Sequence, residues 1–294
     1  MSEFTDITCF QSMTNVAENY DAFIIDVWGV LHDGVSLYSG VVETLENLTK
    51  MSKSFIMLTN APRRSIEVAT AMVDMGLPRK FCNQIFSSGE VTYLDLKLRK
   101  NNFYKTLGNQ FLHVGPKRDR SLFAGLEWVE VHDVENCDLI INTGPWSDNE
   151  TVSQYEALLH KGAEKGVPMI CANPDLEVIR GGKKIICAGS LAAKYEEFGG
   201  NVRWFGKPRE EIYQYCFDAL EGFEKDKIAA IGDSLRTDIS GARCAGIDPI
   251  LVCNGIHREA LCDDYGTVKH LHAVKKLCSE WGVTPRGLLP DFRW

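Results

Sequence analysis

Short apolar runs that alternate with longer amphipathic stretches constrain the fold of this chain most. AFIID at 22–26 and SFIMLT at 54–59 have the length and composition of buried strands. The stretches at 42–51 and 64–76 that follow them repeat apolar residues at helical spacing, and Gly76 is suited to end the second helix. This strand–helix alternation predicts an α/β fold, in which helices cover a parallel sheet.

The same pattern returns twice further along the chain. Near the end it predicts strands at 227–233 and 249–253, with helices at 239–246 and 267–282. In the middle it predicts strands at 111–114, 137–142 and 168–173, with a helix at 156–166. We therefore expect a core built from residues 1–88 and 189–294, interrupted by a smaller α/β domain at 89–188.

The composition of the chain indicates which kinds of binding partner and which cellular compartment to expect. A formal net charge of −8 argues against binding to nucleic acid or to an anionic membrane. The 10 cysteines form no CxxC pair, which favours free thiols in a reduced, cytoplasmic protein. The first residues lack the basic start and apolar run of a secretory signal, and no segment approaches the roughly 20 apolar residues of a membrane span. The oligomeric state stays open, with a homodimer among the alternatives.

Polar residues stand where the predicted strands end. Asp26 ends the first strand, Thr59 and Asn60 end the second, and Asp233 ends a later one, while Lys207 precedes a helix expected to start at Pro208. Ligands of open α/β sheets bind outside the carboxyl ends of the strands, so these side chains are expected to converge. Two converging carboxylates repel each other and favour a cation such as Mg²⁺, whereas a lysine and a hydroxyl suit a phosphoryl group.

Four motifs in this order resemble those of the haloacid dehalogenase-like superfamily. They are DVWGVL at 26–31, LTN at 58–60, GKP at 206–208 and GDSLRTD at 232–238. The interval 61–205 is long enough for the inserted α/β cap of subclass IIA, the NagD-like and p-nitrophenylphosphatase-like branch. ANPD at 172–175 resembles the cap loop of that branch. The resemblance covers nearly the whole chain and implies a Rossmann-like core with an inserted cap.

The resemblance also implies a role for each matching residue. Asp26 is expected to attack phosphorus and become an aspartyl-phosphate, with Thr59 and Lys207 binding the phosphoryl oxygens. The implied cofactor is Mg²⁺, and the implied partner is a small phosphorylated metabolite. The expected magnesium site is formed by Asp26, Asp233, Asp238 and the backbone carbonyl of Trp28, and the expected substrate-binding residues are Asn60, Asn173 and Asp175.

Trp28 departs from the family pattern. Phosphatases of this superfamily usually carry a second Asp two residues after the nucleophile, where it protonates the leaving group. A positioned acid is typically worth about 10²–10⁴-fold in rate, and His32 or Asp33 lies close enough in sequence to replace it. The alternatives are a dehalogenase or carbon–phosphorus hydrolase that needs no such acid, or a non-catalytic protein that binds a phosphoryl ligand.

Overall fold

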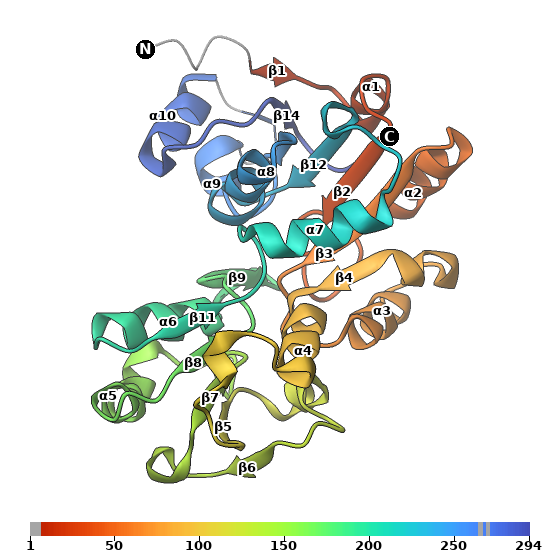
Figure 1. Ribbon diagram of the computed structural model, residues 1–294. Coiled ribbons are helices and arrows are strands. Elements are labelled where there is room, and N and C mark those ends of the chain that lie inside the picture. Colours follow the sequence, from red (N-terminus) through yellow and green to blue (C-terminus); the bar gives the residue numbers. More distant parts are fainter. Residues whose placement is uncertain (1–6, 264–266, 269–270) are drawn as a thin grey trace. The chain divides into compact units, whose positions relative to one another are not determined.

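The computed structural model describes residues 7–263, 267–268 and 271–294, and within them the chain forms two compact units (Figure 1). Unit 1 is assigned Met1–Thr59, Ala69–Phe86 and Lys207–Trp294, and unit 2 is assigned Asn60–Val68 and Ser87–Gly206. Each unit contains its own parallel sheet.

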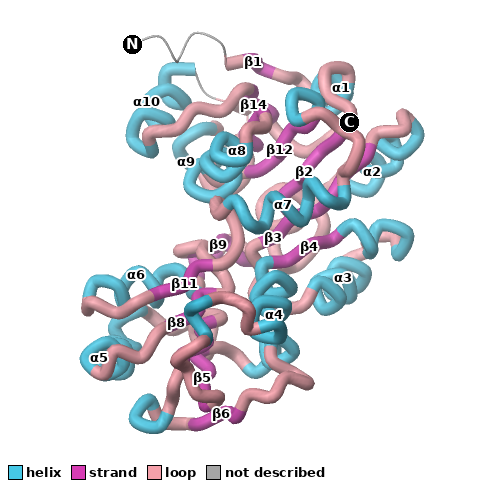
Figure 2. The backbone as a smooth tube through the Cα atoms, in the orientation of Figure 1, coloured by secondary structure: helices cyan, strands magenta, loops and turns pink. Residues whose placement is uncertain are grey.

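Unit 1 is built on a sheet whose described strands follow the order β1-β14-β13-β12-β2-β3-β4. Neighbours from β1 through β3 pair in parallel. The strands are β1 (Thr8–Cys9), β2 (Ala22–Asp26), β3 (Ser54–Thr59), β4 (Ile85–Ser87), β12 (Ile228–Gly232), β13 (Asp248–Val252) and β14 (Gly287–Leu289). The helices that precede or follow them are α1 (Met13–Ala17), α2 (Val41–Lys50), α3 (Ser65–Asp74), α7 (Glu210–Ala219), α8 (Ser240–Ala245), α9 (Arg258–Leu261) and α10 (Leu271–Trp281) (Figure 2).

The apolar runs of the sequence become the buried centre of this sheet. All five residues of β2 are buried, as expected for a parallel strand covered on both faces. Helix α2 buries Val41, Leu45 and Leu48, which recur at i, i+4 and i+7 and so form one apolar face. These confirm the predicted α/β class and the predicted strands at 22–26 and 54–59.

Unit 2 contains a second parallel sheet of described strands, in the order β11-β8-β7-β5-β6. Its strands are β5 (Gln110–Val114), β6 (Val129–Val131), β7 (Leu139–Asn142), β8 (Met169–Cys171) and β11 (Val202–Trp204). An antiparallel hairpin of β9 (Glu177–Arg180) and β10 (Lys183–Ile186) accompanies it, together with α4 (Ser88–Leu98), α5 (Glu156–Glu164) and α6 (Ala188–Glu197).

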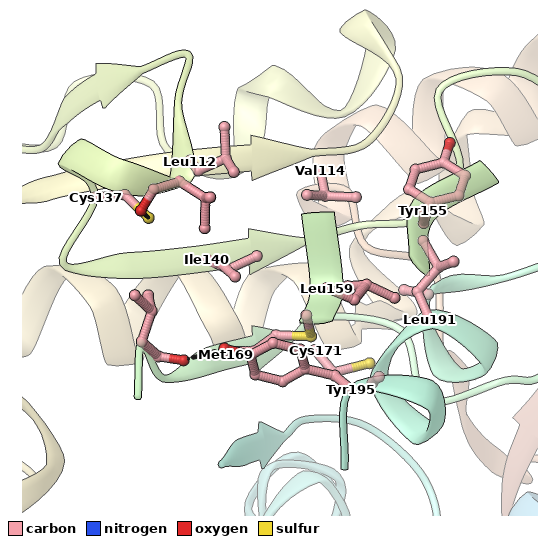
Figure 3. Close-up of a cluster of buried hydrophobic side chains, with 14 residues drawn as sticks. Leu112, Val114, Cys137, Ile140, Tyr155, Leu159, Met169, Cys171, Leu191 and Tyr195 are labelled. Carbon is pink, nitrogen blue, oxygen red and sulfur yellow. Dashed lines mark hydrogen bonds between the residues drawn. The ribbon is translucent and has the colours of Figure 1, made fainter. Parts of the chain in front are cut away.

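The core of unit 2 packs α5 and α6 against its sheet (Figure 3). Leu159 of α5 and Leu191 and Tyr195 of α6 are fully buried beside Ile140 and Met169 of the strands. The Tyr195 hydroxyl donates to the Val167 carbonyl, so its polar end is satisfied inside the core. Helix α6 is therefore an integral part of unit 2.

The extent of unit 2 differs from the expected insertion at 89–188. Residues 189–206 are expected in the core, but they include most of α6, which packs in the core of unit 2, and all of β11, which pairs with β8. Residues 60–68 also fall in unit 2. The helix expected at 267–282 is present as α10, and residues 269–270 at its expected start lie outside the described residues. A cap role for unit 2 stays a prediction.

Candidate active site

Three polar side chains of unit 1 follow adjacent strands at the same edge of the sheet. Asp26 is the last residue of β2, which pairs with β12 on one side and β3 on the other. Thr59 is the last residue of β3, and Asp233 directly follows β12. All three are buried, with exposed fractions of 7%, 4% and 6%. The parallel register thus brings together residues that lie up to about 200 positions apart in sequence.

Lys207 joins this group and connects Asp26 to a further carboxylate, that of Asp238. Its side chain is 4% exposed, and its ammonium donates hydrogen bonds to a carboxylate oxygen of Asp26 and, at 2.6 Å, to Oδ1 of Asp238. The Leu58 carbonyl accepts a third bond at 3.3 Å. An ammonium has three protons to donate, so these contacts fix the lysine in one place.

The carboxylates of Asp26, Asp233 and Asp238 form a compact donor set. One oxygen of each lies within 4.8 Å of the others. Asp238 is also held by the backbone N–H of Ser234 at 3.1 Å, and Asp233 accepts from the backbone N–H of Ile256 at 2.7 Å. Clustered carboxylate oxygens are the ligands that Mg²⁺ prefers, so the residues present fit this ion.

The electrostatics of the cluster agree with that fit. Burial raises the pKa of Asp26 well above its ordinary value, and the nearby charges of Asp238 and Asp233 raise it further, against the opposing effect of Lys207. Burial alone would lower the pKa of Lys207, but Asp238 and Asp26 hold it well above its ordinary value. One ammonium therefore leaves the three carboxylates with surplus negative charge, which a divalent cation would offset.

Two glycines make room for the Asp233 side chain because they have no Cβ atom. Neither of them is identified as a site residue from the sequence. Gly29 has a φ of +83°, and a Cβ there would lie 2.0 Å from Oδ2 of Asp233. A Cβ at Gly255 would lie 2.1 Å from the Cβ of Asp233. The only signal in the sequence is a glycine three residues after the expected nucleophile, inside the first motif.

Gly29→Ala is expected to displace Asp233 and to lower kcat/KM by about a hundredfold, since misplacement by about 1 Å can have that effect. Gly166→Ala is the matched control because Gly166 also has a positive φ, +68°, but its Cβ would meet nothing within 4 Å. Gly166→Ala should lose about 1–2 kcal/mol in urea unfolding from backbone strain, and Gly29→Ala should lose more because its Cβ also collides with Asp233. Equal activity of the two variants would show that activity does not depend on the room that Gly29 leaves for the Asp233 side chain.

Trp28 and its neighbours form a tight turn after β2. The half-buried Trp28 ring meets the His32 ring edge-on, with centroids 5.0 Å apart. The Asp33 carboxylate accepts the backbone N–H groups of Val35 and Ser36, both at 2.8 Å, and the bond from Ser36 in particular lowers its pKa. Asp33 is thus a turn-forming carboxylate that is ionised at neutral pH, which is unfavourable for a proton donor.

The expected substrate-binding residues all lie in unit 2. The Asn60 side-chain amide donates to Oδ1 of Asp175 at 2.9 Å. Oδ1 of Asn173 accepts the backbone N–H of Asp175, also at 2.9 Å, which makes an Asx-turn. The Asp175 carbonyl in turn accepts the backbone N–H of Gly189 at 3.0 Å, so the start of α6 holds this loop. The structure therefore brings Asn60, Asn173 and Asp175 together in one hydrogen-bonded group.

Comparison with known proteins gives matches over most of the chain. A haloacid dehalogenase-like hydrolase family model matches residues 23–128, and an HAD-hydrolase-like model matches residues 204–277. The ribonucleotide monophosphatase NagD of Escherichia coli is 27% identical over 79% of this chain and 87% of its own length. The 5'-nucleotidase YutF of Bacillus subtilis is 23% identical over 90% of this chain and 98% of its own length.

A solved structure gives the same result for the fold. A haloacid dehalogenase-like family hydrolase from Brucella suis has a TM-score of 0.81 and 28% identity, over 96% of this chain and 99% of its own. With this fold and the carboxylate–lysine centre, the chain is a hydrolase of the haloacid dehalogenase-like superfamily. Within that superfamily it belongs to the NagD-like subclass IIA.

Proposed function

We propose that the protein is a magnesium-dependent phosphatase of a small phosphorylated metabolite, acting through Asp26. The observation that carries this proposal is the buried centre in which Lys207 joins Asp26 to Asp238 while Asp233 stands beside them. Relatives named ribonucleotide monophosphatase and acid sugar phosphatase support a phosphate monoester as the substrate.

Each residue of the centre has a definite task in this reaction. A carboxylate oxygen of Asp26 attacks phosphorus, the bond from phosphorus to the leaving oxygen breaks, and an aspartyl-phosphate forms. Water then attacks that phosphorus and releases phosphate with the Asp26 carboxylate restored. Lys207 holds Asp26 in place and, with the Thr59 hydroxyl, would bind phosphoryl oxygens that gain charge during the transfer.

Asp26, Asp233, Asp238 and the backbone carbonyl of Trp28 are the residues that would hold Mg²⁺. When bound, the ion would offset the repulsion between an anionic nucleophile and an anionic substrate. Asn60, Asn173 and Asp175 of unit 2 are proposed to contact the substrate.

A panel of phosphate monoesters, assayed with Mg²⁺ and with EDTA, tests the proposal. We expect phosphate release that requires Mg²⁺ and returns when the metal is restored. Ca²⁺ is expected to bind without supporting turnover, because its longer bonds and higher coordination misplace the ligands. Turnover that is unchanged in EDTA would contradict the assignment of the three carboxylates, and absence of any ester hydrolysis would contradict phosphatase function.

Trp28 at the position of the usual general acid should leave a kinetic signature. We expect kcat/KM to fall steeply as the leaving group becomes more basic, from p-nitrophenyl phosphate to alkyl phosphates, because no carboxylic acid at position 28 protonates the leaving oxygen. Trp28→Asp should flatten this dependence if the variant folds, which far-UV circular dichroism and urea unfolding would verify.

Asp33→Asn is the matched control for this series. The Asp33 carboxylate already accepts hydrogen bonds from two backbone N–H groups. Its replacement should therefore leave the dependence of kcat/KM on leaving-group basicity unchanged. A shallow dependence in the wild type that steepens in Asp33→Asn would identify Asp33 as the acid and refute our interpretation of Trp28.

A further inference from the structure

Three arginines of unit 2 lie together in a pattern that the proposed chemistry does not use. They are Arg63, which follows Asn60 closely in sequence, Arg118 in the short 3₁₀ helix Lys117–Leu122 after β5, and Arg180 at the end of β9. Carboxylates accompany them, among them Asp119 in the same 3₁₀ helix as Arg118 and Asp148 in the loop after β7. Loops that follow the carboxyl ends of parallel strands are where α/β sheets bind ligands.

Both the backbone and the guanidinium group of Arg63 have partners that orient the residue. The Ser87 hydroxyl donates to its backbone carbonyl at 2.6 Å, and its guanidinium lies 3.8 Å from Oδ1 of Asp119. The Arg63 side chain is 27% exposed, so it is accessible, whereas Asp119 is almost fully buried. An arginine that is already oriented loses less conformational entropy when it binds an anion.

Arg118 and Arg180 are oriented by one shared carboxylate. Oδ1 of Asp148 accepts from Arg118 at 3.3 Å, and Oδ2 accepts from Arg180 at 3.0 Å. Both guanidinium groups stay partly exposed, at 52% and 39% of their side chains. Each arginine has five N–H donors, so these contacts leave donors that can reach a ligand.

The charges around these arginines are unevenly distributed. Arg118 and Arg180 share the single carboxylate of Asp148, whereas Arg63 has Asp119 at 3.8 Å. Burial lowers the pKa of Arg63, and the repulsion from Arg118 and Arg180 lowers it further, against the attraction of Asp119 and Glu67. The group of Arg118, Asp148 and Arg180 therefore carries one surplus positive charge close to Arg63, where an anion would be stabilised.

We propose that Arg63, Arg118 and Arg180 form an anion-binding site in unit 2 that takes a carboxylate or phosphate group. Planar guanidinium groups match both anions through paired N–H donors. The anion is either a second acidic group of the substrate or a separate small molecule. The first source rests on the proposed phosphatase function, whereas the site itself does not.

Calorimetric titration of the full chain with malonate, in EDTA, tests the site directly. Arg118→Gln/Arg180→Gln should lower the affinity for malonate at least tenfold. The matched control is Lys161→Gln/Lys165→Gln, which also removes two cations that share one carboxylate in unit 2, that of Glu135. The control should stay within twofold of the wild type. No binding to the wild type, or equal losses in both variants, would overturn the proposal.

A substrate pair distinguishes the two sources of the anion. 3-Phosphoglycerate and glycerol 3-phosphate differ in one carboxylate, and p-nitrophenyl phosphate has no second acidic group. If the substrate supplies the anion, Arg118→Gln/Arg180→Gln should lower kcat/KM for 3-phosphoglycerate at least tenfold relative to kcat/KM for glycerol 3-phosphate. Turnover of p-nitrophenyl phosphate should be unchanged in the same variant. Loss of malonate affinity with an unchanged ratio would support a separate anion. Failure to hydrolyse any ester would refute phosphatase function and leave the malonate result to decide the site.

Discussion

Asp26→Asn is expected to lower kcat by more than about a thousandfold, the scale of loss seen when a covalent nucleophile is removed. An amide is a poor nucleophile and a poor metal ligand, yet it has nearly the shape of the carboxylate. Because Asp26 is buried beside two other acids that raise its pKa, loss of its charge should leave the free energy of unfolding within about 2 kcal/mol of wild type. Steady-state kinetics and urea unfolding would measure both effects.

Asp21→Asn serves as the control, because Asp21 lies just before the same strand but at the surface, where it pairs with Lys53. Its activity should stay within about threefold of wild type, since surface ion pairs contribute little. Acid quenching during turnover of a ³²P-labelled ester should trap label on a peptide that contains Asp26. Residual Asp26→Asn activity above a tenth of wild type, or label on another peptide, would refute the covalent mechanism.

Lys207→Gln is expected to have the largest effect on stability. Removing one partner of a buried ion pair typically costs about 3–5 kcal/mol, and here the ammonium holds two carboxylates with a third beside them. Urea unfolding in EDTA, where no divalent cation can take over the role of the lysine, should show a loss of this size. Phosphatase activity should fall with it.

Lys80→Gln is the control for the loss of a lysine ion pair. Lys80 and its partner Glu46 are both exposed, so this variant should lose less than about 1 kcal/mol. Equal losses in the two variants would mean that the buried ammonium is not what stabilises the carboxylate cluster.

The positions of three polar residues of the candidate site could be predicted because two local signals coincide. Apolar runs such as 22–26 identify buried strands, and the first polar residue after each run lies at the carboxyl edge of the sheet. Asp26, Thr59 and Asp233 were found in this way, and the structure places them at that edge. Their roles in the reaction remain predictions.

The extent of unit 2 could not be predicted in the same manner. Strand β11 is a three-residue segment, VRW, of half-buried residues, and it has no apolar run that would set it apart from a loop. It becomes a strand because β8, which precedes it by about 30 residues, offers a free edge for parallel pairing. The space that Gly29 leaves for Asp233 likewise depends on a residue about 200 positions away, which no local pattern reveals.

The position of β2 between β12 and β3 has a consequence for biosynthesis. Strand β12 begins roughly 200 residues after Asp26, so at about 5–20 residues per second a ribosome needs about 10–40 s to supply the neighbour of β2. During this interval every residue of unit 2 is translated, whereas the edge of β2 that β12 will cover has no native partner. A nascent chain that stalls near residue 220 would contain the whole of unit 2 and an unprotected strand edge, but it would lack Asp233 and Asp238 of the carboxylate cluster.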